Sequence, residues 1–107
     1  MTSQAEFLLA EQLRQAGIPF EAEYKFHPDR KWRADFYIIR SSPRLLVEID
    51  GGAFIGGRHS TGKGVEADCE KTSAAAILGY RVIRATPAQV EDGRCLEWIR
   101  QALGVGA

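Results

Sequence analysis

Residues 32–52 read Trp-Arg-Ala-Asp-Phe-Tyr-Ile-Ile-Arg-Ser-Ser-Pro-Arg-Leu-Leu-Val-Glu-Ile-Asp-Gly-Gly. The segment contains two apolar runs, 32–39 and 44–50, and both are typical of buried β-strands. A turn over residues 41–43 separates them, because proline disfavours helix at the residue before it and donates no hydrogen bond to a ladder. Glycines at 51–52 end the second run. Both runs nevertheless carry carboxylates, which buried strands rarely contain.

These carboxylates are Asp35 in the first run, and Glu48 and Asp50 in the second. Glu48 and Asp50 are two residues apart, so their side chains leave the same face of a strand. With Asp35 on the neighbouring strand, the three groups can converge, and like charges so close require a cation or a proton. Oxygen ligands favour a hard divalent ion, so we expect Mg²⁺, with Mn²⁺ as second choice. The alternative is that each acid is a solvent-exposed residue at a strand end.

The composition predicts one globular domain over residues 1–107. The chain is 45% hydrophobic and 26% charged, which is typical of a soluble domain of this length. It contains no apolar run of about 20 residues to span a bilayer, and it begins without the basic-then-apolar pattern of a signal peptide. We therefore expect a cytoplasmic protein with no membrane partner. Cys69 and Cys95 have no metal-ligand spacing, and we expect both to be reduced and partly buried.

Positive charge is concentrated in two segments, although Lys+Arg and Asp+Glu each total 14. One segment is 25–33, and the other is 51–64, which contains six glycines. The glycine-rich segment carries Arg58, His59 and Lys63, all of which are suited to binding phosphate. Basic segments around an acidic site suit a phosphodiester substrate and a metal.

The remaining segments predict the rest of the fold. In chain order we expect a helix over 3–16, a strand over 20–26, a helix over 65–78, a strand over 80–84 and a last helix from residue 86. Ser3 and Glu6 form a capping-box pattern, although Glu6 is also a candidate active-site acid. Asp92-Gly93 kinks or divides the last helix. The first three strands form an antiparallel meander, and the helical crossover makes the last strand parallel to the third.

This α/β order, with its strand-borne acids and following glycines, resembles the PD-(D/E)xK nuclease superfamily over nearly the whole chain. The segments that carry the resemblance are residues 30–36, 48–52, 57–59, 68–71 and 79–84. They resemble small phage endonucleases. The nearest named relatives by this resemblance are the archaeal-type Holliday junction resolvases and the very-short-patch mismatch endonucleases. The resemblance implies a restriction-endonuclease-like αβββαβα core, a mixed sheet with helices on its faces, and Mg²⁺-dependent cleavage of DNA.

Carried over by position, the resemblance also implies ligands for the metal. Asp35 and Glu48 would bind it directly, the Ile49 carbonyl would add a third oxygen, and Glu6 would reach it through water. The sequence departs from the family pattern at Asp50, where a lysine is usual. Asp50 can itself hold metal.

The missing lysine leaves open which residue orients or deprotonates the attacking water. Lys71 on the second helix can reach the site from another backbone position, and His59 is the second candidate, because imidazole titrates near neutral pH. The alternative for each is a surface residue without a catalytic role.

The DNA contacts expected from this reading are basic residues around the site. They are Lys25, Lys31, Arg33, Arg58, His59 and Lys63. Phosphate contacts give affinity without reading sequence, so we expect selectivity for DNA shape. A Holliday junction resolvase acting as a homodimer on branched DNA is the first hypothesis. The alternatives are a monomeric mismatch or nicking endonuclease, and a nuclease-fold DNA-binding subunit without catalytic activity.

Overall fold

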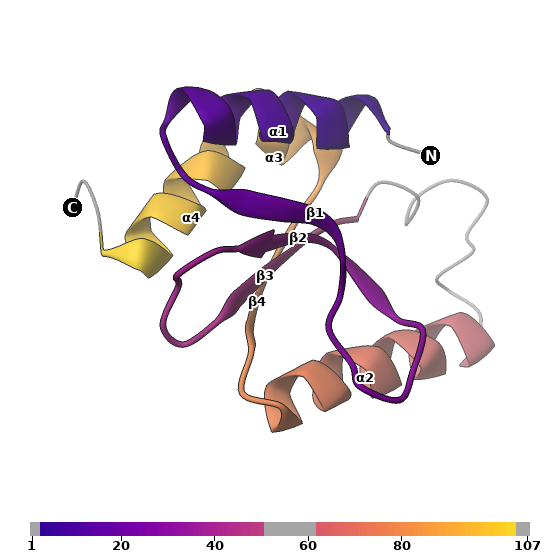
Figure 1. The fold of residues 1–107 in the computed structure, drawn as a ribbon. Helices are drawn as coiled ribbons and strands as arrows, with labels where there is room; N and C mark the ends of the chain where they lie inside the picture. Colours follow the sequence, from indigo (N-terminus) through magenta and orange to yellow (C-terminus); the bar gives the residue numbers. More distant parts are fainter. Residues whose placement is uncertain (1–2, 51–61, 105–107) are drawn as a thin grey trace.

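A computed structural model describes residues 3–50 and 62–104 of the chain. In that part a four-stranded sheet lies between helices (Figure 1). The elements in chain order are α1 (Gln4–Gln15), β1 (Phe20–Lys25), β2 (Arg33–Ile38), β3 (Leu45–Ile49), α2 (Gly62–Ile77), β4 (Arg81–Ala85), α3 (Pro87–Glu91) and α4 (Arg94–Leu103). The expected αβββαβα order is confirmed, and the last helix is divided at Asp92-Gly93, where Gly93 has a φ of 90°.

The sheet has the expected mixed topology. Its order is β1-β2-β3-β4. β1 pairs antiparallel with β2, β2 pairs antiparallel with β3, and β3 pairs parallel with β4. The crossover between the two parallel strands contains α2, which covers one face of the sheet, while α1, α3 and α4 cover the other (Figure 1). The two faces are called the α2 face and the α1 face below.

Each face of the sheet has its own apolar core. On the α1 face, Leu9 and Leu13 lie one helical turn apart and are fully buried against Phe36 and Val47 of the sheet. On the α2 face, the core is smaller and mainly aromatic. Its buried members are Phe26, Ala34, Leu46, Ala75 and Tyr80. The sheet is therefore covered by helices on both sides, as expected for this class of fold.

The first helix begins with the capping box that the sequence predicts. The Ser3 backbone N–H donates to Glu6 Oε1 at 2.8 Å, and the Glu6 backbone N–H donates to Ser3 Oγ at 3.1 Å. The reciprocal bonds satisfy two helix-end donors. They also fix the Glu6 side chain at the end of α1 that lies near the sheet.

The cysteines differ from each other in burial. Cys95 is fully buried on the α1 face, and burial raises the pKa of its thiol to about 11. Cys69 is exposed on α2, which corrects the expectation that both are partly buried. The reason is that α2 packs on the sheet through Ala75, on a different side of the helix. Both cysteines are free. Within the described ranges, no helix combines the length and the apolar character needed to cross a bilayer.

The alternation of side chains along β2 is broken at Asp35. Ala34 packs in the core of the α2 face, whereas Phe36 and Ile38 pack in the core of the α1 face. Residues two apart on a regular strand point to the same side, so the strand is distorted between Ala34 and Phe36. On β1, Glu23 lies opposite Asp35 in the register and has a φ of 52°. Both strands are therefore irregular at the same position.

Candidate active site

Three carboxylates meet on the α1 face where β1 and β2 are irregular. Glu6, Glu23 and Asp35 each place one carboxylate oxygen within 4.8 Å of the other two. They come from α1, β1 and β2 respectively. Glu6 and Asp35 are half-buried, and Glu23 is exposed. Within residues 3–50 and 62–104, no lysine or arginine forms an ion pair with any of them.

The backbone holds Asp35 in this cluster from two directions. Its Oδ2 accepts a hydrogen bond from the Ile49 backbone N–H at 2.7 Å. Its own backbone N–H donates to Glu48 Oε2 at 3.3 Å. These two bonds replace regular ladder bonds between β2 and β3 at the end of the sheet. They fix the Asp35 carboxylate beside β3 while Glu48 lies on the other face.

A left-handed backbone conformation is the structural feature that distinguishes Glu23. A φ of 52° is strained for a residue with a side chain, and costs of order 1–2 kcal/mol. The Arg33 guanidinium donates to the Glu23 backbone carbonyl at 3.2 Å and holds this turn. Strain of this kind is concentrated at functional sites.

The electrostatics of the cluster favour uptake of positive charge. Burial raises the pKa of Asp35 from 3.8 to about 7; the negative charges of Glu48 and Glu6 act in the same direction, against the opposing bond from Ile49. For Glu6, burial also acts to raise the pKa, but the bonds from Ser3 outweigh it, and the pKa is lowered. The raised pKa lets Asp35 retain a proton closer to neutral pH than an ordinary aspartate does, and a bound cation would replace that positive charge.

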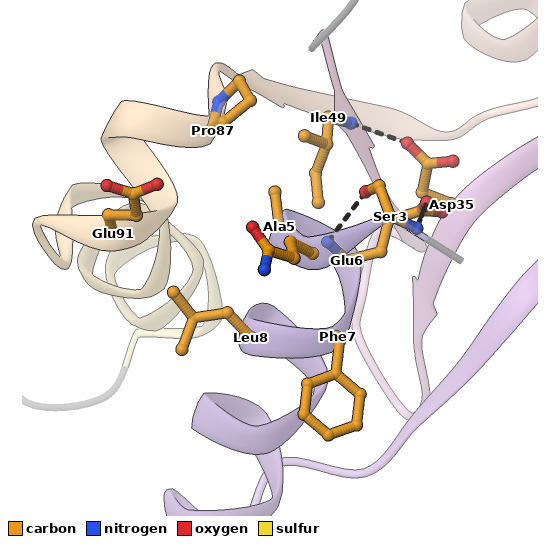
Figure 2. Close-up of a pocket in the computed structure, with 10 residues that line it drawn as sticks. Ser3, Ala5, Glu6, Phe7, Leu8, Asp35, Ile49, Pro87 and Glu91 are labelled. Carbon is orange, nitrogen blue, oxygen red and sulfur yellow. Dashed lines mark hydrogen bonds between the residues drawn. The ribbon is translucent and has the colours of Figure 1, made fainter.

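An open hollow gives access to the cluster. It has a volume of about 720 Å³, and it lies between the first turns of α1 and the start of α3, with Glu6, Asp35 and Ile49 in its wall (Figure 2). A second hollow of about 180 Å³ lies on the β1 side of the same carboxylates and includes Glu23. Phe7, which is 63% exposed, lines both hollows. The cluster is thus open to a large ligand.

The acids of the α2 face are paired with basic residues. Lys71 Nζ lies 3.0 Å from Glu48 Oε1, and both side chains are about a quarter exposed. Arg84 lies 3.0 Å from Asp50 Oδ2 and 3.7 Å from Asp68 Oδ2. Lys71 of α2 contacts Glu48, which is on the opposite face of the sheet from the carboxylate cluster, and a catalytic role for Lys71 stays a prediction.

The structure brings together a different set of carboxylates from the one expected. Asp35, Glu48 and Asp50 were expected to converge, but in the described part of the chain no group of three within the same distance includes Glu48 or Asp50. The reason is the break in alternation at Asp35, which turns its side chain to the α1 face while Glu48 and Asp50 lie with their basic partners. Ile49 contacts Asp35 through its backbone N–H, whereas the resemblance implied a metal-binding role for its carbonyl.

The predicted DNA-binding residues divide into two groups. Lys25, Lys31 and Arg33 are exposed at the site end of β1 and β2. Arg58, His59 and the side chain of Lys63 lie outside the described residues. The roles of all six stay predictions.

Glu23 is the site residue that the sequence reasoning missed. It belongs to Phe-Glu-Ala-Glu-Tyr-Lys, an alternation typical of a half-exposed strand, and so it resembles any other solvent-facing acid. The signal available was the hairpin register, which places residue 23 opposite residue 35 once the two strands are paired.

The cluster fits a hard divalent cation. All three donors are carboxylate oxygens, which are the ligands that Mg²⁺ and Mn²⁺ prefer. Glu6, Glu23 and Asp35 would hold such an ion. Glu48 would support Asp35 by accepting a hydrogen bond from the Asp35 backbone N–H. The raised pKa of Asp35 is consistent with this, because a metal-free carboxylate cluster retains protons that a cation displaces.

Comparison with solved structures shows a shared architecture. The chain is similar to the catalytic domain of the homing endonuclease I-Bth0305I, with a TM-score of 0.62, 21% sequence identity, and coverage of 96% of this chain and 92% of that chain. The two chains share a fold. No family model matches the sequence, and no curated protein does. The shared fold confirms the expected α/β class, whereas the resemblances to the PD-(D/E)xK superfamily, junction resolvases and mismatch endonucleases stay predictions.

Proposed function

We propose that this chain is a metal-dependent DNA endonuclease. The observation that carries the proposal is the cluster of Glu6, Glu23 and Asp35, which has no basic partner in the described part of a nuclease-type fold. Structural carboxylates are normally solvated or paired. A group of three that is neither fully solvated nor paired is suited to binding a divalent cation, with Mg²⁺ expected first and Mn²⁺ second.

Each residue of the site has a distinct role in the proposed reaction. A bound divalent cation lowers the pKa of a water molecule and stabilises negative charge on a phosphate. Glu6, Glu23 and Asp35 would hold the cation. Glu48 positions Asp35 through the Asp35 N–H, and Lys71 in turn fixes Glu48. Lys71 therefore acts as a positioning residue, in place of the family lysine that Asp50 replaces.

Within this class, resolution of Holliday junctions by a homodimer is the first hypothesis for the substrate. The second is nicking of mismatched duplex by a monomer. Both use the same carboxylate cluster and differ in the DNA shape that is bound. A nuclease-fold DNA-binding subunit without catalysis is the third, and it is the one favoured if the cluster binds no metal.

The test uses the purified full chain and end-labelled four-way, three-way, mismatched and linear duplexes of one sequence. We expect Mg²⁺- or Mn²⁺-dependent cleavage that is lost in Asp35→Asn and retained in Glu66→Gln, a matched charge change at an exposed position of α2. Cleavage of the four-way substrate by a dimer supports resolution, and cleavage of the mismatched substrate by a monomer supports nicking. Absence of cleavage on every substrate, with DNA still bound, contradicts the proposal and leaves the binding subunit.

A further inference from the structure

The connection between β1 and β2, residues 26–32, is a folded loop with an aromatic core. Phe26 is buried, and Trp32 stacks on it with ring centroids 6.3 Å apart at 16°. His27 Nδ1 accepts hydrogen bonds from the backbone N–H groups of Asp29 and Arg30, at 3.0 and 3.1 Å. The loop is therefore ordered by its own contacts without any ligand.

One arginine joins this loop to α2. The Arg30 guanidinium carbon lies 4.2 Å from the centre of the Trp32 ring, and Arg30 Nη2 lies 2.9 Å from Glu70 Oε1. Arg30 thus lies over an aromatic ring and binds a carboxylate of the neighbouring helix. We call Arg30, Trp32 and Glu70 the latch.

The loop and its strand ends carry positive charge that the latch does not neutralise. Lys25, Lys31 and Arg33 are exposed, and none of them forms an ion pair within residues 3–50 and 62–104. Asp29 is the one carboxylate in residues 25–33. In a chain with a formal net charge of zero, this is a local excess of positive charge.

This basic surface begins beside the carboxylate cluster. Lys25 pairs with Arg33 in the β1–β2 register, two residues from Glu23 and Asp35 on the respective strands. Arg33 also binds the Glu23 backbone carbonyl at 3.2 Å. A polyanion bound along the loop would therefore extend directly to the cluster.

We propose that residues 25–33 form a preordered arm that binds the phosphate backbone of duplex DNA next to the cleaved phosphate, with Lys25 and Lys31 as phosphate contacts. The latch holds the arm against α2, so Arg30, Trp32 and Glu70 are positioning residues. The inference rests on the proposed function for its substrate. It adds that DNA is bound through its backbone, by an arm whose shape is fixed before binding, which reduces the entropy cost of association.

The contacts are tested by the salt dependence of binding. Fluorescence anisotropy measures the affinity of the full-length Asp35→Asn protein for a labelled linear duplex over a series of KCl concentrations. Lys25→Ala and Lys31→Ala should each reduce the slope of log K against log salt by about 0.9, the value for one phosphate contact. Arg40→Gln removes the same charge at the opposite end of the sheet and should leave the slope unchanged. Slopes equal to that of Arg40→Gln overturn the arm.

The latch is tested by comparing DNA binding by variants of two glutamates on α2. Glu70→Gln and Glu66→Gln each remove one negative charge from an exposed position of α2, but only Glu70 binds the arm. By charge alone, both variants should bind DNA equally or more tightly than the parent. The latch predicts that Glu70→Gln instead binds more weakly than Glu66→Gln, by about two- to five-fold, as for loss of one exposed ion pair. Equal or tighter binding by Glu70→Gln overturns the latch.

The same measurements separate this inference from the proposed function. If the parent binds duplex DNA but the lysine variants keep its slope, the arm is wrong and the endonuclease proposal stands. If no duplex DNA is bound at low salt, the proposed function fails together with the arm. Duplex RNA and polyglutamate serve as competitors, and equal binding of either one overturns DNA as the partner of the arm.

Discussion

At one end of the sheet, the acidic residues of the two faces differ in whether they form ion pairs with basic residues. On the α2 face, Glu48 binds Lys71, and Arg84 binds Asp50 and Asp68. On the α1 face, the cluster of Glu6, Glu23 and Asp35 has no basic partner in the described part of the chain, and it opens to a hollow of about 720 Å³.

This difference predicts which acids support the fold and which acids bind a ligand. Partly exposed ion pairs contribute about 0–1 kcal/mol each and need nothing further. A cluster of like charges destabilises the protein until a proton or a cation enters. Removing an acid from the α1 face should therefore strongly lower cleavage and spare stability, whereas removing a charge from the α2 face should lower stability slightly and lower cleavage less.

The largest effect is expected for Asp35→Asn. Cleavage should fall by more than about 10²-fold, because even residues that only support a metal ligand account for about 10–100-fold. The free energy of unfolding of the metal-free protein at pH 8 should not fall, because the substitution removes a half-buried charge. Metal-dependent cleavage assays and urea denaturation measure the two quantities. Full cleavage, or a loss of stability without loss of cleavage, would show that Asp35 has a structural role and is not needed for catalysis.

Glu23 offers a pair of variants that separates its charge from its backbone strain. Glu23→Gln and Glu23→Gly should both lower metal affinity and cleavage by about 10–100-fold, because both lack the carboxylate. Glu23→Gly should unfold at higher urea concentration than Glu23→Gln, because glycine adopts a φ of 52° without strain. Glu21→Gln, on the same strand, is the matched control and should retain metal affinity. Equal metal affinity in Glu21→Gln and Glu23→Gln would remove Glu23 from the site.

The raised pKa of Asp35 predicts a pH dependence of opposite sign for metal binding and for stability. Because the folded state raises this pKa from 3.8 to about 7, it binds more protons than the unfolded state between these values. The contribution to stability is fully present below 3.8 and is lost as pH rises through about 7. A cation must displace the proton, so metal affinity should rise about tenfold per pH unit below that pKa and level off above it.

Isothermal titration with Mn²⁺ between pH 5 and pH 9 measures the metal affinity, and thermal unfolding in chelator measures the stability over the same range. Asp35→Asn provides the control, since it should flatten both profiles. A metal affinity independent of pH in the parent would show that the cluster is already ionised and that burial does not govern Asp35.

The smallest effect is expected on the α2 face. Lys71→Met and Glu48→Gln should each destabilise the protein by about 1 kcal/mol or less, and a double-mutant cycle should give a coupling energy of about 0.5–1 kcal/mol. Cleavage in Lys71→Met should fall by about tenfold, as for a residue that supports a metal ligand from the second layer. A loss of cleavage as large as that of Asp35→Asn would make Lys71 a catalytic residue in its own right.

Much of the fold follows from local sequence signals. The Ser3–Glu6 capping box, the two apolar runs around residues 41–43, and the proline after Thr86 predict elements that the structure contains. Strand order follows as well, because short connections make antiparallel neighbours and a helical crossover makes a parallel pair. These features depend on residues close together in the chain.

The site was only partly predictable because it depends on contacts between distant residues. Asp35 was identified because an acid in an apolar run is unusual, and Lys71 because the family lysine was missing. The composition of the cluster depended on the break in alternation at Asp35, which no pattern of residues 32–39 indicates. Regular periodicity placed Asp35 with Glu48 and Asp50, while the distorted strand placed it with Glu6 and Glu23.

The backbone turn at Glu23 has a further consequence, because β1 is an outer strand of the described sheet. A straight outer strand exposes a row of unsatisfied amides that can recruit strands from other molecules and start aggregation. In β1 this row is interrupted by the left-handed residue, and Glu21 and Lys25 add charge on either side. The β1 edge of the sheet is therefore protected against edge-to-edge pairing with other molecules.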